Sequence, residues 1–156
     1  MHLKKNTLLI PAIERGSVID HIPPGLGLKI IRILQLENPS FTLTLAMHLC
    51  SKRLGLKDLI KIDSLMLSDS DAHKIAIFAP HGTINVIQNF KVEKKIRATL
   101  PHSIASILVC PNKACITRHE PCSSFFFVKE HKTKVYLGCK YCQKDFLRDE
   151  IKEYTL

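Results

Sequence analysis

The first hundred residues contain stretches in which apolar and polar residues alternate, as in strands that bury one face. There are three of them: residues 41–49, 58–65 and 83–94. Polar residues 51–57 separate the first two stretches and predict a hairpin between them. Two shorter apolar runs, residues 7–13 and 17–22, lie on either side of a turn at Gly16. They predict one strand together with its continuation or its partner.

Two further stretches repeat apolar side chains with the period of an amphipathic helix. Residues 26–36 form the first, which stops before Pro39. Residues 68–79 form the second, with Ser68 as an N-cap and Pro80 at its end. The predicted order is strand, strand or bulge, helix, strand, strand, helix, strand. This order is close to βαββαβ and predicts an α+β protein whose N-terminal part is a ferredoxin-like α/β sandwich.

Residues 94–102 are basic, show no periodicity and contain Pro101, so we expect the domain boundary there. The predicted domains are residues 1–100 and residues 101–156. In the second domain we expect a strand, the two arms of a hairpin and a last helical turn at residues 104–109, 123–128, 134–137 and 149–154. A domain of this size buries too little apolar surface to be stable alone.

Two cysteine pairs flank the predicted hairpin, with spacings C-x4-C and C-x2-C and twenty-three residues between the pairs. They are Cys110, Cys115, Cys139 and Cys142. Tetrahedral Zn²⁺ binds four thiolates at about 2.3 Å, and two cysteine-bearing loops supply them. Gly138 precedes the second pair and is expected to let the backbone turn tightly. The pattern predicts a small zinc-ribbon-like β domain with one structural Zn²⁺, which has no open position for a catalytic water.

Disulfides and a redox-active dithiol are the alternatives for these cysteines. Export is not expected, because the charged residues 1–5 are not followed by the apolar core of a signal peptide. Without export, paired cysteines favour metal binding over disulfides. No apolar run approaches the roughly 20 residues that span a bilayer, so we expect a cytoplasmic protein with no membrane partner. Cys50 and Cys122 are interpreted as ordinary thiols.

The 156 residues include 23 Lys and Arg against 14 Asp and Glu, a net charge of +9. This balance favours an anionic partner: nucleic acid, a phosphorylated small molecule or an acidic protein surface. The sequence contains no P-loop, GxGxxG motif or nucleophile elbow, so catalysis is not expected. A basic zinc-ribbon protein that binds nucleic acid is one hypothesis. The aromatic run at residues 125–127, however, lacks the pattern of an RNA-recognition motif.

Two polar features of the first domain are candidate binding groups. Asp20 and His21 end an apolar run, where they would bind a ligand or satisfy backbone groups near a turn. The structural role is favoured. Adjacent strand residues point to opposite faces, so the two residues are not expected to form a catalytic dyad by themselves. Lys61 lies within an alternating stretch, and lysines that converge on a sheet face bind phosphate. Lys94 and Lys95 are its candidate partners.

Five segments carry a more specific pattern: ERGSVIDHIPPGLGLKI, KDLIKID, NVIQNFKV, LVCPNKACITRHEP and LGCKYCQKDF. Together and in this order they closely resemble the regulatory chains of aspartate carbamoyltransferase, over nearly the whole sequence. The resemblance implies a non-catalytic subunit of pyrimidine biosynthesis. Its N-terminal domain would bind CTP as inhibitor and ATP as opposing effector, with UTP alongside CTP in some members. Its zinc domain would dock on the catalytic chain, regulatory-chain homodimers would bridge catalytic trimers, and nucleic acid would not be a partner.

The resemblance also implies the residues of the nucleotide site. They are Ala12, Ile13, Val18, Asp20, His21, Lys61, Asn85, Ile87, Phe90 and Lys95. Lys61 and Lys95 would contact the ribose and the phosphates, and His21 would lie toward the phosphates. Asp20 and the backbone around Ala12 and Ile13 would read the base.

Three positions depart from the family pattern. Phe90 replaces a frequent tyrosine and lacks its hydroxyl group, and Thr7 replaces a lysine. Near the metal, Ala114 replaces an amide that lies at the subunit interface of some members. Asn112, Glu120 and the residues beside Cys142 remain the candidates for contact with the catalytic chain, and a solvated loop is the alternative interpretation.

Overall fold

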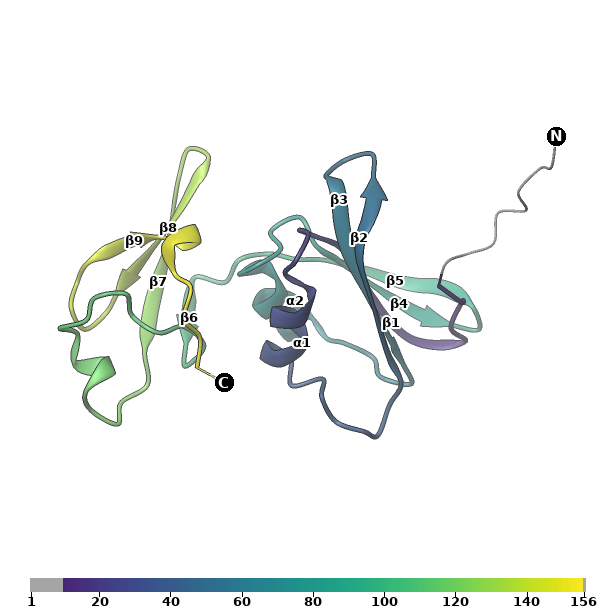
Figure 1. Cartoon of the computed structure of the whole chain (residues 1–156), viewed down its shortest axis with the longest axis horizontal. Coiled ribbons are helices and arrows are strands. Elements are labelled where there is room, and N and C mark those ends of the chain that lie inside the picture. The colour runs from purple at the N-terminus through teal and green to yellow at the C-terminus, as the bar shows by residue number, and fades with distance from the viewer. Residues whose placement is uncertain (1–9, 156) are drawn as a thin grey trace. The chain divides into compact units, whose positions relative to one another are not determined.

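The N-terminal part of this computed structural model is a five-stranded antiparallel sheet with two helices on one face (Figure 1). The structure describes residues 10–155, and the chain divides between Ala98 and Thr99 into two compact units. The elements of the first unit are β1 (Arg15–Ile22), α1 (Gly27–Ile33), β2 (Leu43–Ser51), β3 (Gly55–Asp63), α2 (Asp69–Ala76), β4 (Thr83–Gln88) and β5 (Lys91–Arg97). The strand order β2-β3-β1-β4 is ferredoxin-like, and β5 extends the sheet at one edge. The predicted α+β sandwich is confirmed, with one strand more than expected.

The core of this unit lies between the sheet and the helices. The strands contribute four fully buried isoleucines: Ile19, Ile60, Ile62 and Ile84. The helices contribute Ile30 and Ile75, which are equally buried. Because side chains alternate along a strand, Val18, Lys61 and Asn85 point to the opposite face, where Figure 1 shows no helix. That face can therefore carry polar groups without disturbing the core.

The stretch at residues 83–94, which alternation predicts as one strand, is two strands joined by a tight turn at Asn89 and Phe90. Both turn residues have positive φ, 51° and 60°, as in the turns that match the twist of a hairpin. These turns usually contain glycine, and its absence explains why the turn escaped prediction. The strand predicted at residues 7–13 is wrong for residues 10–13, which are irregular, and its first three residues lie outside the described part.

β1 and β2 each carry a bulge opposite the same part of β3. The bulges turn His21 and His48 to positive φ, 60° and 57°. Asp58 of β3 is fully buried beside them. Its Oδ1 accepts a hydrogen bond from the His48 N–H at 3.0 Å, and its Oδ2 accepts from Gly25 at 2.8 Å and Gly27 at 3.1 Å. Asp58 thus fixes one bulge and the loop between β1 and α1 to β3.

The C-terminal unit is a four-stranded antiparallel sheet in the order β6-β7-β8-β9. Its elements are β6 (Ser103–Ala105), the 3-10 helix η1 (Ile116–Arg118), β7 (Phe125–His131), β8 (Lys134–Cys139), β9 (Asp145–Leu147) and the 3-10 helix η2 (Arg148–Glu150). Ile104, Phe126 and Leu137 form its core. The hairpin is where the sequence predicts it, whereas the strand expected at residues 104–109 is only three residues long and β9 was not predicted. In the described part of the chain, no helix is long and apolar enough to cross a membrane.

Candidate functional site

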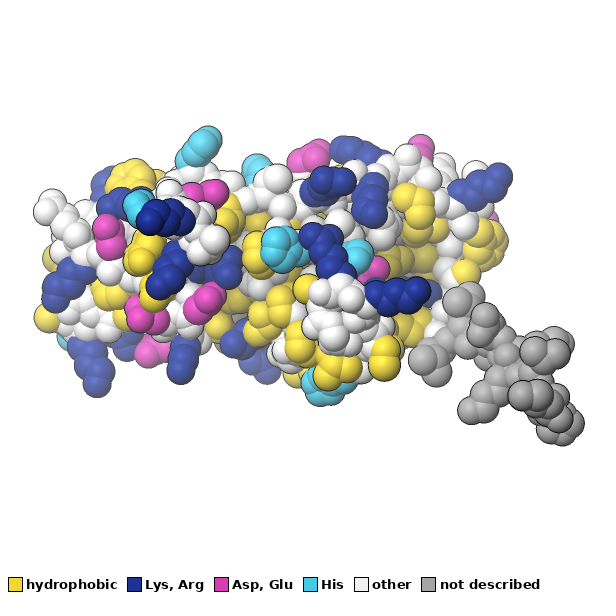
Figure 2. Space-filling model, turned by 90° about the horizontal axis from the view of Figure 1, so that it is seen from above, with side chains coloured by type: hydrophobic (Ala, Val, Ile, Leu, Met, Phe, Trp, Pro, Cys, Tyr) yellow, Lys and Arg dark blue, Asp and Glu magenta, His cyan; other side chains and the backbone are white. Residues whose placement is uncertain are grey.

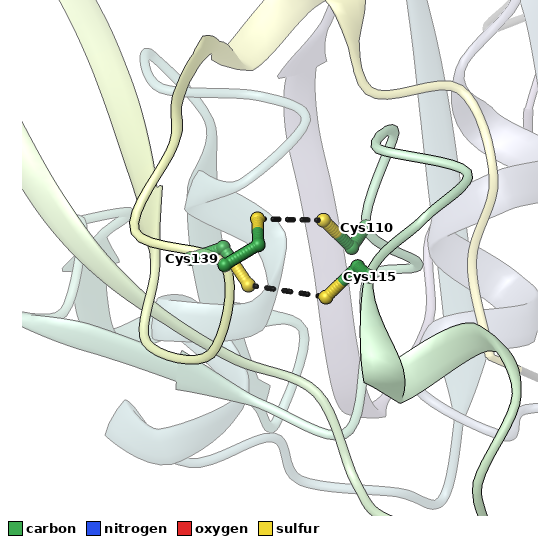
Figure 3. A group of neighbouring side chains, drawn as sticks. Cys110, Cys115 and Cys139 are labelled. Carbon is green, nitrogen blue, oxygen red and sulfur yellow. Dashed lines mark hydrogen bonds between the residues drawn. The ribbon is translucent and has the colours of Figure 1, made fainter.

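Four cysteine sulfurs meet between two loops of the C-terminal unit. Cys110 and Cys115 precede η1, and Cys139 and Cys142 lie at and after the end of β8 (Figure 3). The four Sγ atoms lie within 4.8 Å of one another, with 3.7 Å between Cys110 and Cys142 and 3.8 Å between Cys115 and Cys139. Four sulfurs bound to one Zn²⁺ are about 3.8 Å apart, whereas bonded disulfide sulfurs are about 2.05 Å apart. The cluster therefore has the dimensions of a tetrahedral zinc site.

The four thiols differ in how readily they ionise. Burial raises the pKa of Cys110 and of Cys139. Burial also raises the pKa of Cys115. Hydrogen bonds from the hydroxyl group of Thr117, 3.2 Å away, and from the backbone of Thr117 outweigh burial, however, and lower the pKa of Cys115 to about 7. Burial is likewise outweighed by hydrogen bonds at Cys142, whose pKa is lowered. All four become thiolates together only when a nearby cation compensates their charge, as a divalent metal does.

The first cysteine loop is held by its own polar groups. The Oδ1 atom of Asn112 accepts a hydrogen bond from the Ala114 N–H at 3.2 Å. Arg118 donates from Nη1 to the Cys110 carbonyl oxygen at 2.9 Å and from Nη2 to Glu153 at 3.0 Å. These contacts fix the Cys110 backbone to the last residues of the described chain. The first cysteine loop is thus held both by its own polar groups and by Glu153.

The second cysteine loop differs from the expectation at Gly138. This glycine lies within β8, and the residue with positive φ is Gln143, at 59°. A Cβ atom at Gly138 would lie 2.6 Å from Oδ1 of Asp145. That carboxylate oxygen accepts a hydrogen bond from Lys129 at 2.7 Å. The glycine is therefore needed for a close approach of side chains, and its prediction as a turn residue is wrong.

One row of side chains crosses the face of the N-terminal sheet that carries no helix. Lys61 of β3 lies opposite Val18 of β1, Val18 opposite Asn85 of β4, and Asn85 opposite Lys95 of β5. Residues directly opposite each other in antiparallel strands share one face. Three strand spacings of about 4.8 Å separate the two lysines by roughly 14 Å. This set, here called the lysine row, has a cation at each end and suits an extended anionic ligand.

Four polar side chains meet beside the lysine row: those of Asp20, His21, Lys57 and Thr83. Oδ1 of Asp20 accepts hydrogen bonds from Lys57 Nζ at 2.7 Å and from the His21 N–H at 2.6 Å. The ring nitrogen Nδ1 of His21 is 3.2 Å from the Thr83 hydroxyl oxygen and 3.8 Å from the Asp20 carboxylate. Burial raises the pKa of Asp20, but Lys57 outweighs this effect and lowers it. The expectation that Asp20 and His21 separate onto opposite faces is wrong, because the β1 bulge turns His21 back.

Lys61 binds the segment that precedes β1. Its Nζ donates hydrogen bonds to the carbonyl oxygens of Ile10, at 3.2 Å, and of Pro11. Burial lowers the pKa of Lys61. Ala12, which is exposed, and Ile13, which is half-buried, follow directly. The structure thus brings the segment directly before these two predicted site residues to the Lys61 end of the lysine row.

Three further residues considered for the binding site lie outside the lysine row: Ile87, Phe90 and Lys94. Ile87 is almost completely buried in β4. Phe90 lies in the turn that follows, 64% exposed, and its N–H donates to the Glu14 carbonyl oxygen at 3.1 Å. Lys94 binds Asp69 of α2 at 3.1 Å, on the side of the helices. The hypothesis that Lys94 converges with the other lysines is therefore wrong.

Comparison with known proteins decides the family. Residues 8–99 match the allosteric domain of the aspartate carbamoyltransferase regulatory chain, and residues 102–152 match its metal binding domain. The chain belongs to this family. The regulatory chain of Aeromonas hydrophila is 45% identical over 150 residues, covering 96% of this chain and 97% of the relative. That of Vibrio campbellii is 41% identical with 96% and 98% covered, and that of Chromobacterium violaceum 44% identical with 94% and 97% covered.

Regulatory chains of aspartate carbamoyltransferase are non-catalytic, as the sequence predicted for this chain. The allosteric domain precedes a metal-binding domain that contains the buried four-cysteine cluster, in agreement with the predicted structural zinc. Membership also implies association with catalytic chains of aspartate carbamoyltransferase. This assignment replaces the hypothesis of a nucleic-acid-binding zinc ribbon.

Sequence interpretation missed Lys57 as part of this regulatory chain's polar site. It assigned residues 51–57 to a turn, whereas β2 extends to Ser51 and β3 begins at Gly55. A usable signal was present, because Lys57 precedes Lys61 by four residues and strand alternation places both on one face. Recognising the longer strand would have placed a lysine within reach of Asp20.

Proposed function

We propose that the allosteric domain of this regulatory chain binds CTP and ATP along the lysine row. The observation that carries the proposal is the alignment of Lys61, Val18, Asn85 and Lys95 on one sheet face. Lysines at both ends of the row attract an anion, and a length of roughly 14 Å suits an extended ligand better than a single phosphate. Ile87 and Phe90 would line the edge of the same site.

Asp20 and the neighbouring backbone supply acceptors for the base. The Asp20 carboxylate keeps its charge at neutral pH because Lys57 lowers its pKa. Cytosine and adenine both present an exocyclic amino donor, whereas the corresponding position of a uracil-type base is a carbonyl acceptor. Acceptors here, including carbonyl groups around Ala12 and Ile13, therefore favour CTP and ATP over UTP. His21, bonded to Thr83 beyond Asp20, would lie toward the phosphates.

Isothermal titration of the full zinc-loaded chain with CTP and ATP tests this assignment. Lys95→Gln removes one end of the row and should weaken CTP binding at least tenfold, the effect of losing a hydrogen bond to a charged group. Lys91→Gln is the matched control, since Lys91 lies on the same strand but pairs with Gln88 and points to the other face. Equal affinities of the two variants would refute the lysine row as the nucleotide site.

The metal-binding domain would dock on the catalytic chain. One Zn²⁺ on Cys110, Cys115, Cys139 and Cys142 would hold its loops and contribute the folding free energy that a small domain lacks. A nucleotide that binds one quaternary state better than another shifts the equilibrium between them, and such coupling is typically about 1–3 kcal/mol. We place the assembly in the cytoplasm, whose reducing conditions keep cysteines available as ligands.

A homodimer of regulatory chains would form through β2. This strand is at the edge of the sheet, so one side of its backbone is unpaired with other strands of the described chain, and Met47 on it is 36% exposed. Met47→Lys should shift the molar mass measured by light scattering from dimer to monomer. Met66→Lys changes an equally exposed methionine away from this edge and should leave the dimer intact. A monomeric wild-type chain would contradict the dimer.

A further inference from the structure

The three buried cysteines of the four-cysteine cluster are held through their backbone carbonyl groups in two different ways. The Cys139 carbonyl oxygen accepts a hydrogen bond from the Gln143 N–H at 2.9 Å, and the Cys115 carbonyl oxygen accepts one from the Arg118 N–H at 3.0 Å. Both are local backbone contacts. The Cys110 carbonyl oxygen instead accepts from Nη1 of the Arg118 side chain at 2.9 Å. A side chain therefore does at Cys110 what backbone groups do at Cys115 and Cys139.

Arg118 connects both cysteines of the first pair. Its backbone N–H binds the Cys115 carbonyl group and its guanidinium binds the Cys110 carbonyl group, so one residue spans the two ligands. The guanidinium presents its donors in a fixed planar fork, so a bond from Nη1 leaves Nη2 available for a second acceptor. That acceptor is the carboxylate of Glu153, 3.0 Å from Nη2. Glu153 thereby fixes the orientation in which Arg118 reaches Cys110.

The C-terminal segment that contains Glu153 also binds the backbone before Cys110. The Val109 N–H donates to the Glu153 carbonyl oxygen at 3.0 Å, and the Thr155 N–H donates to the Ile107 carbonyl oxygen at 2.8 Å. The chain that leads into Cys110 is therefore held by backbone pairing, and the Cys110 carbonyl group that follows is held by the Arg118 side chain. Both contacts depend on the same C-terminal segment.

Ion pairs are common on the surface of the C-terminal unit. Figure 2 shows Asp and Glu side chains interspersed among the Lys and Arg side chains of this unit. The pair of Lys129 and Asp145 is an example, with side chains 53% and 46% exposed, and such surface pairs contribute little to stability. The Arg118 side chain is only 24% exposed and shares its fork between Glu153 and the backbone of a cysteine. The pair of Arg118 and Glu153 therefore orients a group that holds a metal ligand.

We propose that Arg118, oriented by Glu153, is a positioning residue of the zinc site that keeps Cys110 on the metal and slows the loss of Zn²⁺. The proposal rests on the zinc site of the proposed function and names residues beyond the four ligands that control how long the metal stays bound. Replacing a partner of a metal ligand typically costs roughly 10–100-fold in metal affinity. Since release of the ion begins when a first thiolate leaves it, holding Cys110 should act on the release rate.

The first test measures the release of Zn²⁺ from the full zinc-loaded chain to an excess of a colorimetric chelator. Arg118→Gln should raise the release rate at least about tenfold. Glu153→Ala should raise it less, because Arg118 keeps its bond to Cys110 in this variant. In the double variant, Glu153→Ala should add less than about twofold to the effect of Arg118→Gln, since Glu153 acts through Arg118.

Arg148→Gln is the matched control. The Arg148 side chain is 20% exposed, close to the value for Arg118, and it donates to the carboxylate of Asp149 at 3.1 Å. Its ion pair therefore resembles that of Arg118 but involves no cysteine. Arg148→Gln should leave the release rate of Zn²⁺ within about twofold of wild type.

Alkylation of the zinc-loaded chain separates positioning of one ligand from a general loss of stability. Iodoacetamide reacts slowly with a thiolate that is bound to zinc and quickly with one that the metal has released, and mass spectrometry identifies the modified cysteine. Arg118→Gln should make Cys110 the first of the four cysteines to be modified, at least about tenfold faster than in wild type. Cys115 keeps its backbone partner in this variant and should be modified later. If Arg118→Gln cannot be loaded with zinc, Glu153→Ala carries the test, with the same order of modification expected.

Three results would overturn the proposal while leaving the zinc site in place. In the first, Arg118→Gln releases zinc at the same rate as Arg148→Gln. In the second, all four cysteines are alkylated faster to the same extent, because Arg118 would then stabilise the whole unit and not one ligand. In the third, the effects of Arg118→Gln and Glu153→Ala are fully additive, so that Glu153 does not act through Arg118. A wild-type chain that binds no Zn²⁺ would instead refute the zinc site of the proposed function.

Discussion

Replacing the buried Asp58 with alanine tests how strongly one side chain organises the N-terminal domain. Asp58 is fully buried and accepts three hydrogen bonds from backbone N–H groups, of Gly25, Gly27 and His48. Asp58→Ala leaves all three donors without an acceptor. Each buried donor without a partner costs about 1–3 kcal/mol. The three donors together would cost about 3–9 kcal/mol. Removal of the buried carboxyl group and entry of water offset part of this cost, so we expect a net loss of about 3 kcal/mol.

Such a loss is a large share of the roughly 5–15 kcal/mol that stabilises a typical domain. Asp58→Asn keeps one acceptor oxygen and should cost less, about 1–3 kcal/mol, because at least one donor loses its partner. Asp63→Ala is the matched control on the same strand, since Asp63 is only partly buried and contacts the Ser64 hydroxyl at the surface. Its effect should stay within about 0.5 kcal/mol, as for most surface substitutions.

Urea unfolding of the zinc-loaded chain, followed by far-UV circular dichroism, measures these differences. A typical slope is about 1–3 kcal/mol per molar urea, so Asp58→Ala should lower the midpoint of the N-terminal transition by at least about 1 M. The C-terminal transition should not move. If Asp58→Ala lay within 1 kcal/mol of Asp63→Ala, water or backbone relaxation would be satisfying the three donors and the reasoning would fail.

Two further predictions concern the metal and Asp20. Removing Zn²⁺ with a chelator should abolish hydrogen-exchange protection of the β7–β8 hairpin and leave the sheet of β1–β5 protected. Protection retained in β7–β8 would show that the metal does not stabilise this domain. Lys57 lowers the folded pKa of Asp20 below 3.8, so their pairing stabilises the domain fully at neutral pH and is lost as pH falls through the folded pKa. Asp20→Asn should therefore lower the urea midpoint of unfolding by a constant amount between about pH 5 and 7. The difference between wild type and variant should disappear below about pH 4. A difference that persists in acid would contradict the pairing of Asp20 with Lys57.

The parts of the fold that depend on local rules could be predicted from the sequence. Alternation located β2 and β3, and the hairpin expected between the cysteine pairs is β7–β8. Ser68 caps α2 through reciprocal hydrogen bonds with Asp71, as its position suggested. The cysteine cluster was also accessible, because its ligand types and spacing specify the chemistry before any fold is known. Resemblance of short segments to one family then supplied the expected role of each domain.

The parts that depend on distant contacts could not be predicted. The turn at Asn89 and Phe90 continues the alternation of its flanking strands, so the pattern gave no sign of it. The bulge at His21 arises where β1 pairs with β3, about forty residues further along the chain. Arg118 and Glu153 meet although they are 35 residues apart in the sequence, and no local pattern connects them.

Asp58 links these distant contacts to the polar face of the sheet. Its own side chain is on the core side, while Lys57, the preceding residue of β3, points to the other face and binds Asp20. The bulges that lie opposite Asp58 interrupt the alternation of β1 and β2, and the one in β1 brings His21 beside Asp20. A buried carboxylate that holds β2 and the β1–α1 loop in register thereby sets where the acid, the imidazole and the lysine meet. A residue buried in the core thus determines the geometry of the helix-free sheet face that we assign to the effector.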